Sequence, residues 1–141
     1  MKYRIMFIDD SIGVLESLKW IFIDEPYYLF ASNSSFEALS MIGSLEIAVV
    51  VAYQYMQEMD VLEFLKNVSV KSPYTMVIIM TGYSGIKETL DAKYSDSIYR
   101  FVKKPLDYNE IKQVVKTAIN NYEIISGSIR QAVYHKQCSQ F

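Results

Sequence analysis

Five short runs of mostly apolar residues recur along the chain, separated by polar and turn-forming residues. Each run is long enough for a strand and too short for a helix. Two of them, 47–52 and 76–80, are apolar throughout, as expected for central parallel strands that are covered on both faces. The five predicted strands cover residues 5–8, 27–31, 47–52, 76–80 and 98–102.

Apolar residues at helical spacing fill the segments between these runs. Ser11 is a candidate cap for a first helix, whose apolar residues recur over 14–22 until Pro26 ends the pattern. Ser34 and Glu37 have the spacing of a capping box at the start of a second helix. The sequence therefore predicts a helix after each of the first two strands.

Three further helices follow the later strands. Residues 61–65 indicate a third helix, and residues 86–94 are a weaker candidate for a fourth. Asp107 is placed to cap a final helix. Strands that alternate with helices in this way are typical of an α/β fold built on a doubly wound parallel sheet.

In such a sheet, ligand chemistry gathers at the carboxyl ends of the strands. Polar or ionisable residues occupy that position on four of the five predicted strands: Asp9, Asp10, Tyr53, Thr81 and Lys104. The Asp9-Asp10 pair allows two interpretations. Adjacent carboxylates suit Mg²⁺, which prefers oxygen ligands, but Asp is equally common in turns and helix caps.

Composition narrows the class of protein. A length of 141 residues suits one domain, and a hydrophobic content of 51% with 21% charged residues argues against disorder. A net charge of −2 gives no general attraction to nucleic acid or to an anionic membrane. The single Cys138 excludes an internal disulfide and suits a reducing cytosol, and no apolar segment is long enough to span a membrane. We therefore expect a cytoplasmic protein.

Several short motifs together resemble one known family. Asp9-Asp10, Thr81-Gly82 and Lys104-Pro105 are similar, in order and strand context, to motifs of response regulator receiver domains, the CheY-like superfamily. Residues 56–61, Met-Gln-Glu-Met-Asp-Val, resemble the stretch that follows the phosphorylated aspartate in that family. The resemblance implies a flavodoxin-like (βα)5 fold with five parallel strands in the order 2-1-3-4-5.

The resemblance covers about residues 3–122 of the chain. We therefore expect a receiver-like domain over residues 1–125. Residues 126–141 are expected to be either a C-terminal tail or an extension of the last helix.

The resemblance also assigns roles to single residues. It places Tyr53 where receivers carry the aspartate that accepts the phosphoryl group, and it makes Asp9 and Asp10 the remaining acidic pocket for Mg²⁺. It assigns Thr81 to the hydroxyl residue that follows the phosphoryl group and Phe101 to the switch aromatic. Simpler roles stay open for these last two, namely a helix cap for Thr81 and packing in a groove for Phe101.

Lys104 corresponds to the lysine of the receiver pocket, and Lys104-Pro105 is expected to keep the family's turn, with a cis bond. If Lys104 points inward as the resemblance implies, we expect it to pair with Asp9 or Asp10 without any metal. A carboxylate in the loop, Glu58 or Asp60, is a possible substitute acceptor, but a solvent-facing role is expected for both.

Tyr53 changes the chemistry of the pocket. A phenol is neutral near pH 7, is a poor ligand for a hard cation and is not a carboxylate nucleophile. We expect weak or absent Mg²⁺ binding and no other cofactor. The ring is expected to cover the pocket with its hydroxyl bonded to Lys104 or to an Asp carboxylate. The ring either locks one receiver conformation or merely fills the space.

The resulting prediction is a pseudo-receiver: a protein interaction module of bacterial two-component, phosphorelay-type signalling that is not phosphorylated. The alternative is a receiver that still responds, through another ligand or an unconventional phosphorylation. We do not expect an enzyme, because the sequence has no catalytic triad, Cys-His pair, phosphate loop or zinc-ligand spacing.

The expected partners are proteins: a sensor kinase, an output protein or a second copy of the chain. Docking is expected on the face formed by the fourth helix, the fifth strand and the fifth helix, with no nucleic acid or membrane partner. The last helix also carries a heptad pattern typical of a coiled coil, which Gly127 weakens. We favour a frayed tail over a paired helix here. The heptad residues are Ile111, Val115, Ala118, Tyr122, Ile125, Ile129 and Ala132.

Overall fold

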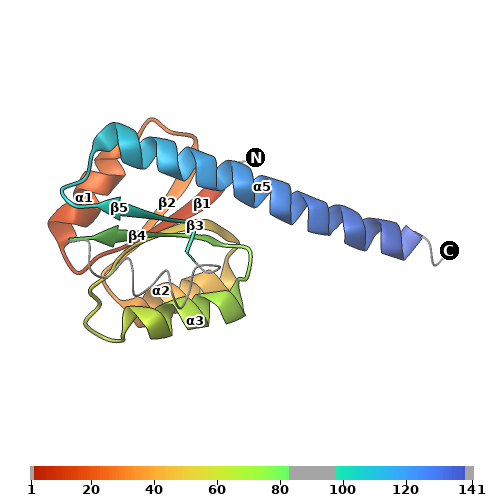
Figure 1. Cartoon of the computed structure of the whole chain (residues 1–141), viewed down its shortest axis with the longest axis horizontal. Coiled ribbons are helices and arrows are strands. Elements are labelled where there is room, and N and C mark those ends of the chain that lie inside the picture. Colours follow the sequence, from red (N-terminus) through yellow and green to blue (C-terminus); the bar gives the residue numbers. More distant parts are fainter. Residues whose placement is uncertain (1, 83–97, 139–141) are drawn as a thin grey trace.

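The computed structural model describes residues 2–82 and 98–138, with side chains as far as Gly127. The described chain forms five strands and four helices (Figure 1). The strands are β1 (Tyr3–Ile8), β2 (Tyr27–Ser32), β3 (Ile47–Tyr53), β4 (Met76–Thr81) and β5 (Arg100–Lys103). The helices are α1 (Ile12–Ile21), α2 (Ser35–Ser44), α3 (Val61–Lys71) and α5 (Tyr108–Cys138).

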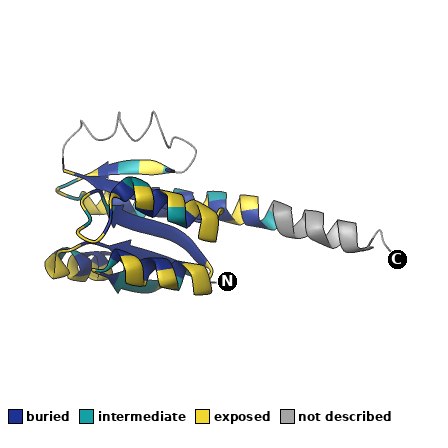
Figure 2. Ribbon diagram, turned by 90° about the horizontal axis from the view of Figure 1, so that it is seen from below, coloured by how far each residue is buried: buried dark blue, intermediate teal, exposed yellow. Residues whose placement is uncertain are grey.

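All five strands pair in one parallel sheet with the order β2-β1-β3-β4-β5. The predicted fold class and strand order are therefore confirmed. The central strand β3 is buried along its length until Tyr53, as its unbroken apolar run predicts. The dark blue strands in the middle of Figure 2 show the same burial.

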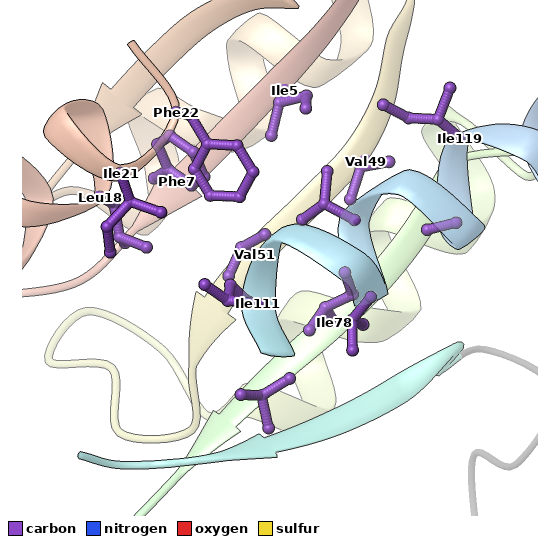
Figure 3. Close-up of a cluster of buried hydrophobic side chains, with 14 of the residues drawn as sticks. Ile5, Phe7, Leu18, Ile21, Phe22, Val49, Val51, Ile78, Ile111 and Ile119 are labelled. Carbon is purple, nitrogen blue, oxygen red and sulfur yellow. The ribbon is translucent and has the colours of Figure 1, made fainter. Parts of the chain in front are cut away.

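One face of the sheet is covered by α1 and α5. Side chains alternate between the two faces of a strand, so Ile5 and Phe7 of β1 point to this side. They pack with Leu18 of α1, and Val49 and Val51 of β3 meet residues of α5 on the same face (Figure 3). This layer holds both helices against the strand ends that form the site.

The opposite face is covered by α2 and α3. The intervening strand residues, such as Met6 and Val50, pack there against Leu39 of α2 and Phe64 of α3. The sheet is therefore enclosed between two helical layers, and Figure 1 shows α5 above the strands and α2 and α3 below them. Two buried clusters of this kind are what a doubly wound fold requires.

The predicted helix caps form, with one difference. Ser11 accepts a hydrogen bond from the Val14 amide at 3.3 Å, and Ser34 accepts one from the Glu37 amide at 3.2 Å. The capping box at Ser34 is only half formed, because the Ser34 amide donates to Ser32 Oγ at 3.0 Å instead of to Glu37. The terminal strand residue Ser32 has replaced the glutamate as the local acceptor.

The later elements differ slightly from their predicted bounds. The fifth strand begins at Arg100 rather than at residue 98, and the fourth-helix candidate at 86–94 lies outside the described residues. Asp107 caps α5 as predicted, because its Oδ1 accepts from the amides of Asn109 and Glu110, each at 3.0 Å.

The helix α5 does not end where it leaves the sheet. It is helical through Cys138, so the frayed tail that we favoured is not what this segment forms. Figure 1 shows the helix projecting well past the edge of the sheet. Within the described residues, no helix combines the length and the apolar character needed to cross a membrane.

Candidate functional site

The parallel register brings the predicted site residues to one edge of the sheet. Ile8 pairs with Ala52, so Asp9, the residue after β1, follows beside Tyr53, the last residue of β3. Thr81 pairs with Lys103, which places Lys104 directly after the β4–β5 ladder. The backbone amide of Lys104 donates to the Thr81 carbonyl at 2.7 Å and fixes this turn. Four strand ends therefore meet in one place.

Asp9 is the buried anion of this site. Its residue exposure is 2%, and both of its carboxylate oxygens have partners. Oδ1 accepts from the Ser11 amide at 3.0 Å, and Oδ2 accepts from Lys104 Nζ at 2.7 Å. The expected pairing of Lys104 with one of the two aspartates is therefore confirmed, and Asp9 is that partner. The pair is close enough to be a charge-assisted hydrogen bond.

Asp10 lies differently from Asp9. It is exposed to solvent, whereas Asp9 is buried. Among the described residues, no group of three or more His, Cys, Asp or Glu side chains is arranged to hold a metal ion. The two aspartates are therefore adjacent in sequence but occupy different environments, and Asp9 already balances the charge of Lys104.

Tyr53 ends β3 and lies against Lys104. Lys104 Nζ is 3.5 Å from the centroid of the Tyr53 ring, which is the geometry of a cation–π contact. The prediction that the Tyr53 hydroxyl bonds to Lys104 or to an aspartate is therefore wrong. It is the face of the ring that meets the ammonium, while the hydroxyl lies near Gly82, 3.5 Å from where a Cβ on that glycine would stand. That the ring covers the pocket stays a prediction.

Two neighbours of Tyr53 were missed by sequence reasoning. Tyr55 packs edge-on against Tyr53, with ring centroids 5.5 Å apart and an interplanar angle of 82°. Gln54 is 3% exposed, and neither side-chain Nε2 nor Oε1 has a hydrogen-bond partner in the part of the chain that is described. A buried amide without partners is rare, and nothing in its sequence context marked it.

The comparisons with known proteins agree with this arrangement. The model of the response regulator receiver domain matches residues 5–116, most of the chain. This chain belongs to the response regulator receiver domain family. The resemblance inferred from three short motifs is thereby confirmed at the level of the family.

Curated relatives of this receiver domain are longer proteins. It is 26% identical over 121 residues to the transcriptional regulatory protein ZraR of Escherichia coli O157:H7, covering 86% of this chain and 27% of that protein. It is 28% identical over 116 residues to the regulatory protein AtoC of Escherichia coli (strain K12), covering 82% of this chain and 25% of the relative. The chain thus spans about a quarter of the length of these relatives.

Solved structures give the same fold. The signal receiver domain of an HD domain-containing protein from Pseudomonas fluorescens Pf-5 superposes with a TM-score of 0.81 at 24% identity, covering 89% of this chain and 93% of that one. The beryllofluoride-activated NtrC4 receiver domain dimer has a TM-score of 0.76 at 26% identity, covering 84% and 98%. That structure is a dimer of receiver domains.

The remaining site residues of this receiver domain lie as follows. Thr81 is buried at the end of β4 with an exposed fraction of 5%. Phe101 of β5 is half-buried and packs against the cluster beneath α2 and α3, and its role as a switch aromatic or as a packing residue stays open. The Lys104-Pro105 bond is cis, as expected. The carboxylates considered as substitutes, Glu58 and Asp60, are both exposed, and Asp60 caps α3 by accepting from the Leu62 amide at 3.2 Å.

An apolar surface lies beside the site. Two adjoining pockets between α1 and the start of α5 share Ser17, Ile21 and Tyr108. Trp20 is 73% exposed and Tyr108 is 63% exposed at the rim of this groove, whose other end reaches Lys104. Large exposed aromatic residues beside a groove are typical of protein interaction surfaces.

Proposed function

We propose that this receiver domain is a pseudo-receiver, an interaction module of two-component signalling that accepts no phosphoryl group. The supporting observation is the Tyr53 ring against Lys104 at the end of β3, at the position that the family resemblance assigns to the acceptor aspartate. A phenol offers neither the carboxylate nucleophile nor the oxygen ligand that phosphoryl transfer to an aspartate requires.

The charges around Tyr53 support the same proposal. Phosphoryl transfer relies on a cation that neutralises the transferring oxygens. Here the buried Asp9 carboxylate is already neutralised by Lys104 at 2.7 Å. A metal ion at Asp9 would have to displace the lysine, and it would find one carboxylate fewer than the family pattern supplies. If Mg²⁺ binds at all, Asp9 and Asp10 are the residues that would hold it, with low affinity. The proposal includes no catalytic activity.

Such a module acts by docking to a protein: a sensor kinase, an output protein or a second copy. The groove between α1 and α5 is the described surface best suited to this role, because Trp20 and Tyr108 offer large apolar contacts at its rim. The face with the fourth helix expected from the sequence includes residues outside the described ranges. The cytoplasmic location and the absence of nucleic acid partners stay predictions.

The helix α5 supports a second copy of the chain as one of these partners. The heptad residues Val115, Ala118 and Tyr122 are buried in the domain, whereas Ile125, the next one, is 41% exposed. By sequence, the pattern continues beyond the domain. Pairing of this segment between two copies would cover Ile125, as in a parallel coiled coil. We include this homodimer in the proposed function.

The experiment that tests the proposal is an amide correlation NMR spectrum recorded with and without Mg²⁺ and beryllofluoride, a mimic of the aspartyl phosphate. We expect the amide peaks of Asp10, Tyr53, Thr81 and Lys104 to stay unchanged at millimolar Mg²⁺. Shifts that spread from this pocket to Phe101 would contradict the proposal and would favour the alternative, a receiver that still responds through another carboxylate or ligand.

The matched variant is Tyr53→Asp, which returns a carboxylate to the end of β3. In this variant, Mg²⁺ and beryllofluoride are expected to shift the same peaks, because Asp9, Thr81 and Lys104 are still in place around position 53. A response in Tyr53→Asp together with silence in the natural chain would assign the loss of phosphorylation to this one residue.

A further inference from the structure

Lys104 makes two strong contacts at once. Its ammonium donates to Asp9 Oδ2 at 2.7 Å, and it lies 3.5 Å from the centroid of the Tyr53 ring. Its side chain is only 21% exposed, so little water competes for the charge. Cation–π contacts strengthen as the cation loses water. The ammonium is therefore held between the Asp9 carboxylate, just after β1, and the Tyr53 ring at the end of β3.

The Tyr53 ring is itself supported from two sides. Tyr55 meets it edge-on, with 5.5 Å between the centroids, and the Tyr53 hydroxyl lies near Gly82, 3.5 Å from where a Cβ on that glycine would stand. A ring fixed in this way presents its face to Lys104 without losing further freedom. The residues around Tyr53 thus orient its ring for the cation–π contact, which does not depend on Lys104 alone.

The backbone of Lys104 is also tied to the sheet. Its amide donates to the Thr81 carbonyl at 2.7 Å, so β4 is joined to the same residue. Through Lys104, the ends of β1, β3 and β4 are connected to the turn that follows β5. In a receiver with an aspartate in place of Tyr53, the lysine would face two carboxylates. One of them, the aspartate at position 53, would gain or lose a phosphoryl group with the signal. Here the Tyr53 ring takes the place of the second carboxylate, and Asp9 is the carboxylate that Lys104 contacts.

We propose that Tyr53 is an aromatic clamp that holds Lys104, and with it the turn between β5 and α5, in a single conformation. This inference rests on the proposed function, because a permanent clamp is compatible only with a site that takes no phosphoryl group. It goes further than the proposed function because it gives the tyrosine at position 53 a structural role. The aromatic ring locks the domain instead of merely filling the space left by an aspartate.

The test uses NMR of the full chain with no phosphodonor, metal or beryllofluoride, so its outcome is independent of the proposed function. Protons on the lysine Cε carbon are shifted upfield when they lie over an aromatic face. We expect such a shift for Lys104 in the natural chain. A Lys104 Cε proton shift typical of a solvated lysine would overturn the clamp without any variant.

Two variants separate the ring face from its bulk and its hydroxyl. Tyr53→Phe keeps the face, and the upfield shift and the hydrogen-exchange protection of the Lys104 amide are expected to persist. Tyr53→Leu keeps an apolar side chain without a π face. In this variant the shift should vanish and the Lys104 amide should exchange roughly tenfold faster, as expected for loss of one desolvated cation–π contact.

Tyr74→Leu is the matched control, because Tyr74 is a 41% exposed tyrosine that lines a pocket away from this site. It should leave both readouts unchanged. Equal protection of the Lys104 amide in Tyr53→Leu and Tyr53→Phe would overturn the clamp and would mean that position 53 needs only an apolar side chain.

Discussion

Lys104 and Asp9 form an ion pair at 2.7 Å whose two members differ in exposure: the Lys104 side chain is 21% exposed and that of Asp9 is fully buried. Removing Lys104 and removing Asp9 therefore lower the stability of the fold by different amounts. A buried carboxylate left alone has no access to water, whereas a lysine left alone is able to turn its ammonium outward.

From this asymmetry we predict that Lys104→Met lowers the free energy of unfolding by about 3 kcal/mol, because it leaves the buried Asp9 charge unpaired. Asp9→Asn should cost only about 1 kcal/mol, because the new amide oxygen still accepts from the Ser11 amide and Lys104 reaches solvent. Urea denaturation of each variant measures both values.

Lys112→Met is the control for the loss of a lysine. Its partner Glu25 is 3.9 Å away and both side chains are substantially exposed, so the expected change is below about 0.5 kcal/mol. Equal costs for Lys104→Met and Asp9→Asn would contradict the assignment of Asp9 as the more strongly desolvated partner.

Gln54 gives a prediction of opposite sign. Its amide group is buried without hydrogen-bond partners among the described residues, so the folded state bears the cost of its desolvation. Gln54→Leu should therefore raise the free energy of unfolding by about 1–2 kcal/mol. Gln57→Leu, at an exposed loop position, should change it by less than about 0.5 kcal/mol. A loss of stability in Gln54→Leu would show that the amide is hydrogen-bonded in solution.

The sequence was sufficient for the fold because its signals are local and repeated. Continuous apolar runs such as 47–52 predicted buried parallel strands, and the parallel order then placed Asp9, Tyr53 and Lys104 at one edge. Cap residues such as Asp107 also act within one turn of their own position, so they were recognised from spacing alone.

The details of the site depend on contacts between distant segments, which spacing does not contain. The sequence suggested a hydroxyl bond for Tyr53, but the ring packs edge-on against Tyr55, its hydroxyl lies near Gly82 and its face meets Lys104. Gln54 directly follows β3, and nothing in the sequence around it predicts whether its amide is buried. Its burial arises from tertiary packing, and no local pattern reports it.

Stability at alkaline pH should depend on Tyr27. Burial raises the pKa of Tyr27 above its ordinary value of 10.0, and the nearby Glu25 charge raises it further. The folded chain therefore holds this proton more tightly than the unfolded chain, and the stabilisation is fully present below about pH 10. It is lost as the pH rises from 10 through the folded-state pKa.

We predict that the free energy of unfolding falls as the pH rises above about 10, the ordinary tyrosine pKa, and that Tyr27→Phe falls less steeply over the same range. Glu25→Gln should give an intermediate slope, because it removes only the smaller of the two causes. Urea denaturation at several pH values measures the slopes. If Tyr27→Phe had the same slope as the natural chain, other tyrosines would have to account for the loss.

Two neighbouring isoleucines on α5 test the proposed homodimer. Ile125 continues the heptad pattern of the core and is 41% exposed, whereas Ile124 is 65% exposed and lies off that pattern. A lysine at a heptad core position is poorly tolerated in a coiled coil. Ile125→Lys should therefore raise the dimer dissociation constant at least about tenfold in sedimentation equilibrium, a change of about 1.4 kcal/mol.

Ile124→Lys, with the same change of charge and side chain one position away, should leave the dissociation constant within about twofold, since the residue does not face the seam. A natural chain that stays monomeric at all concentrations, or equal effects of the two substitutions, would reject pairing through this face of α5 and would leave the groove beside Trp20 as the docking surface of the module.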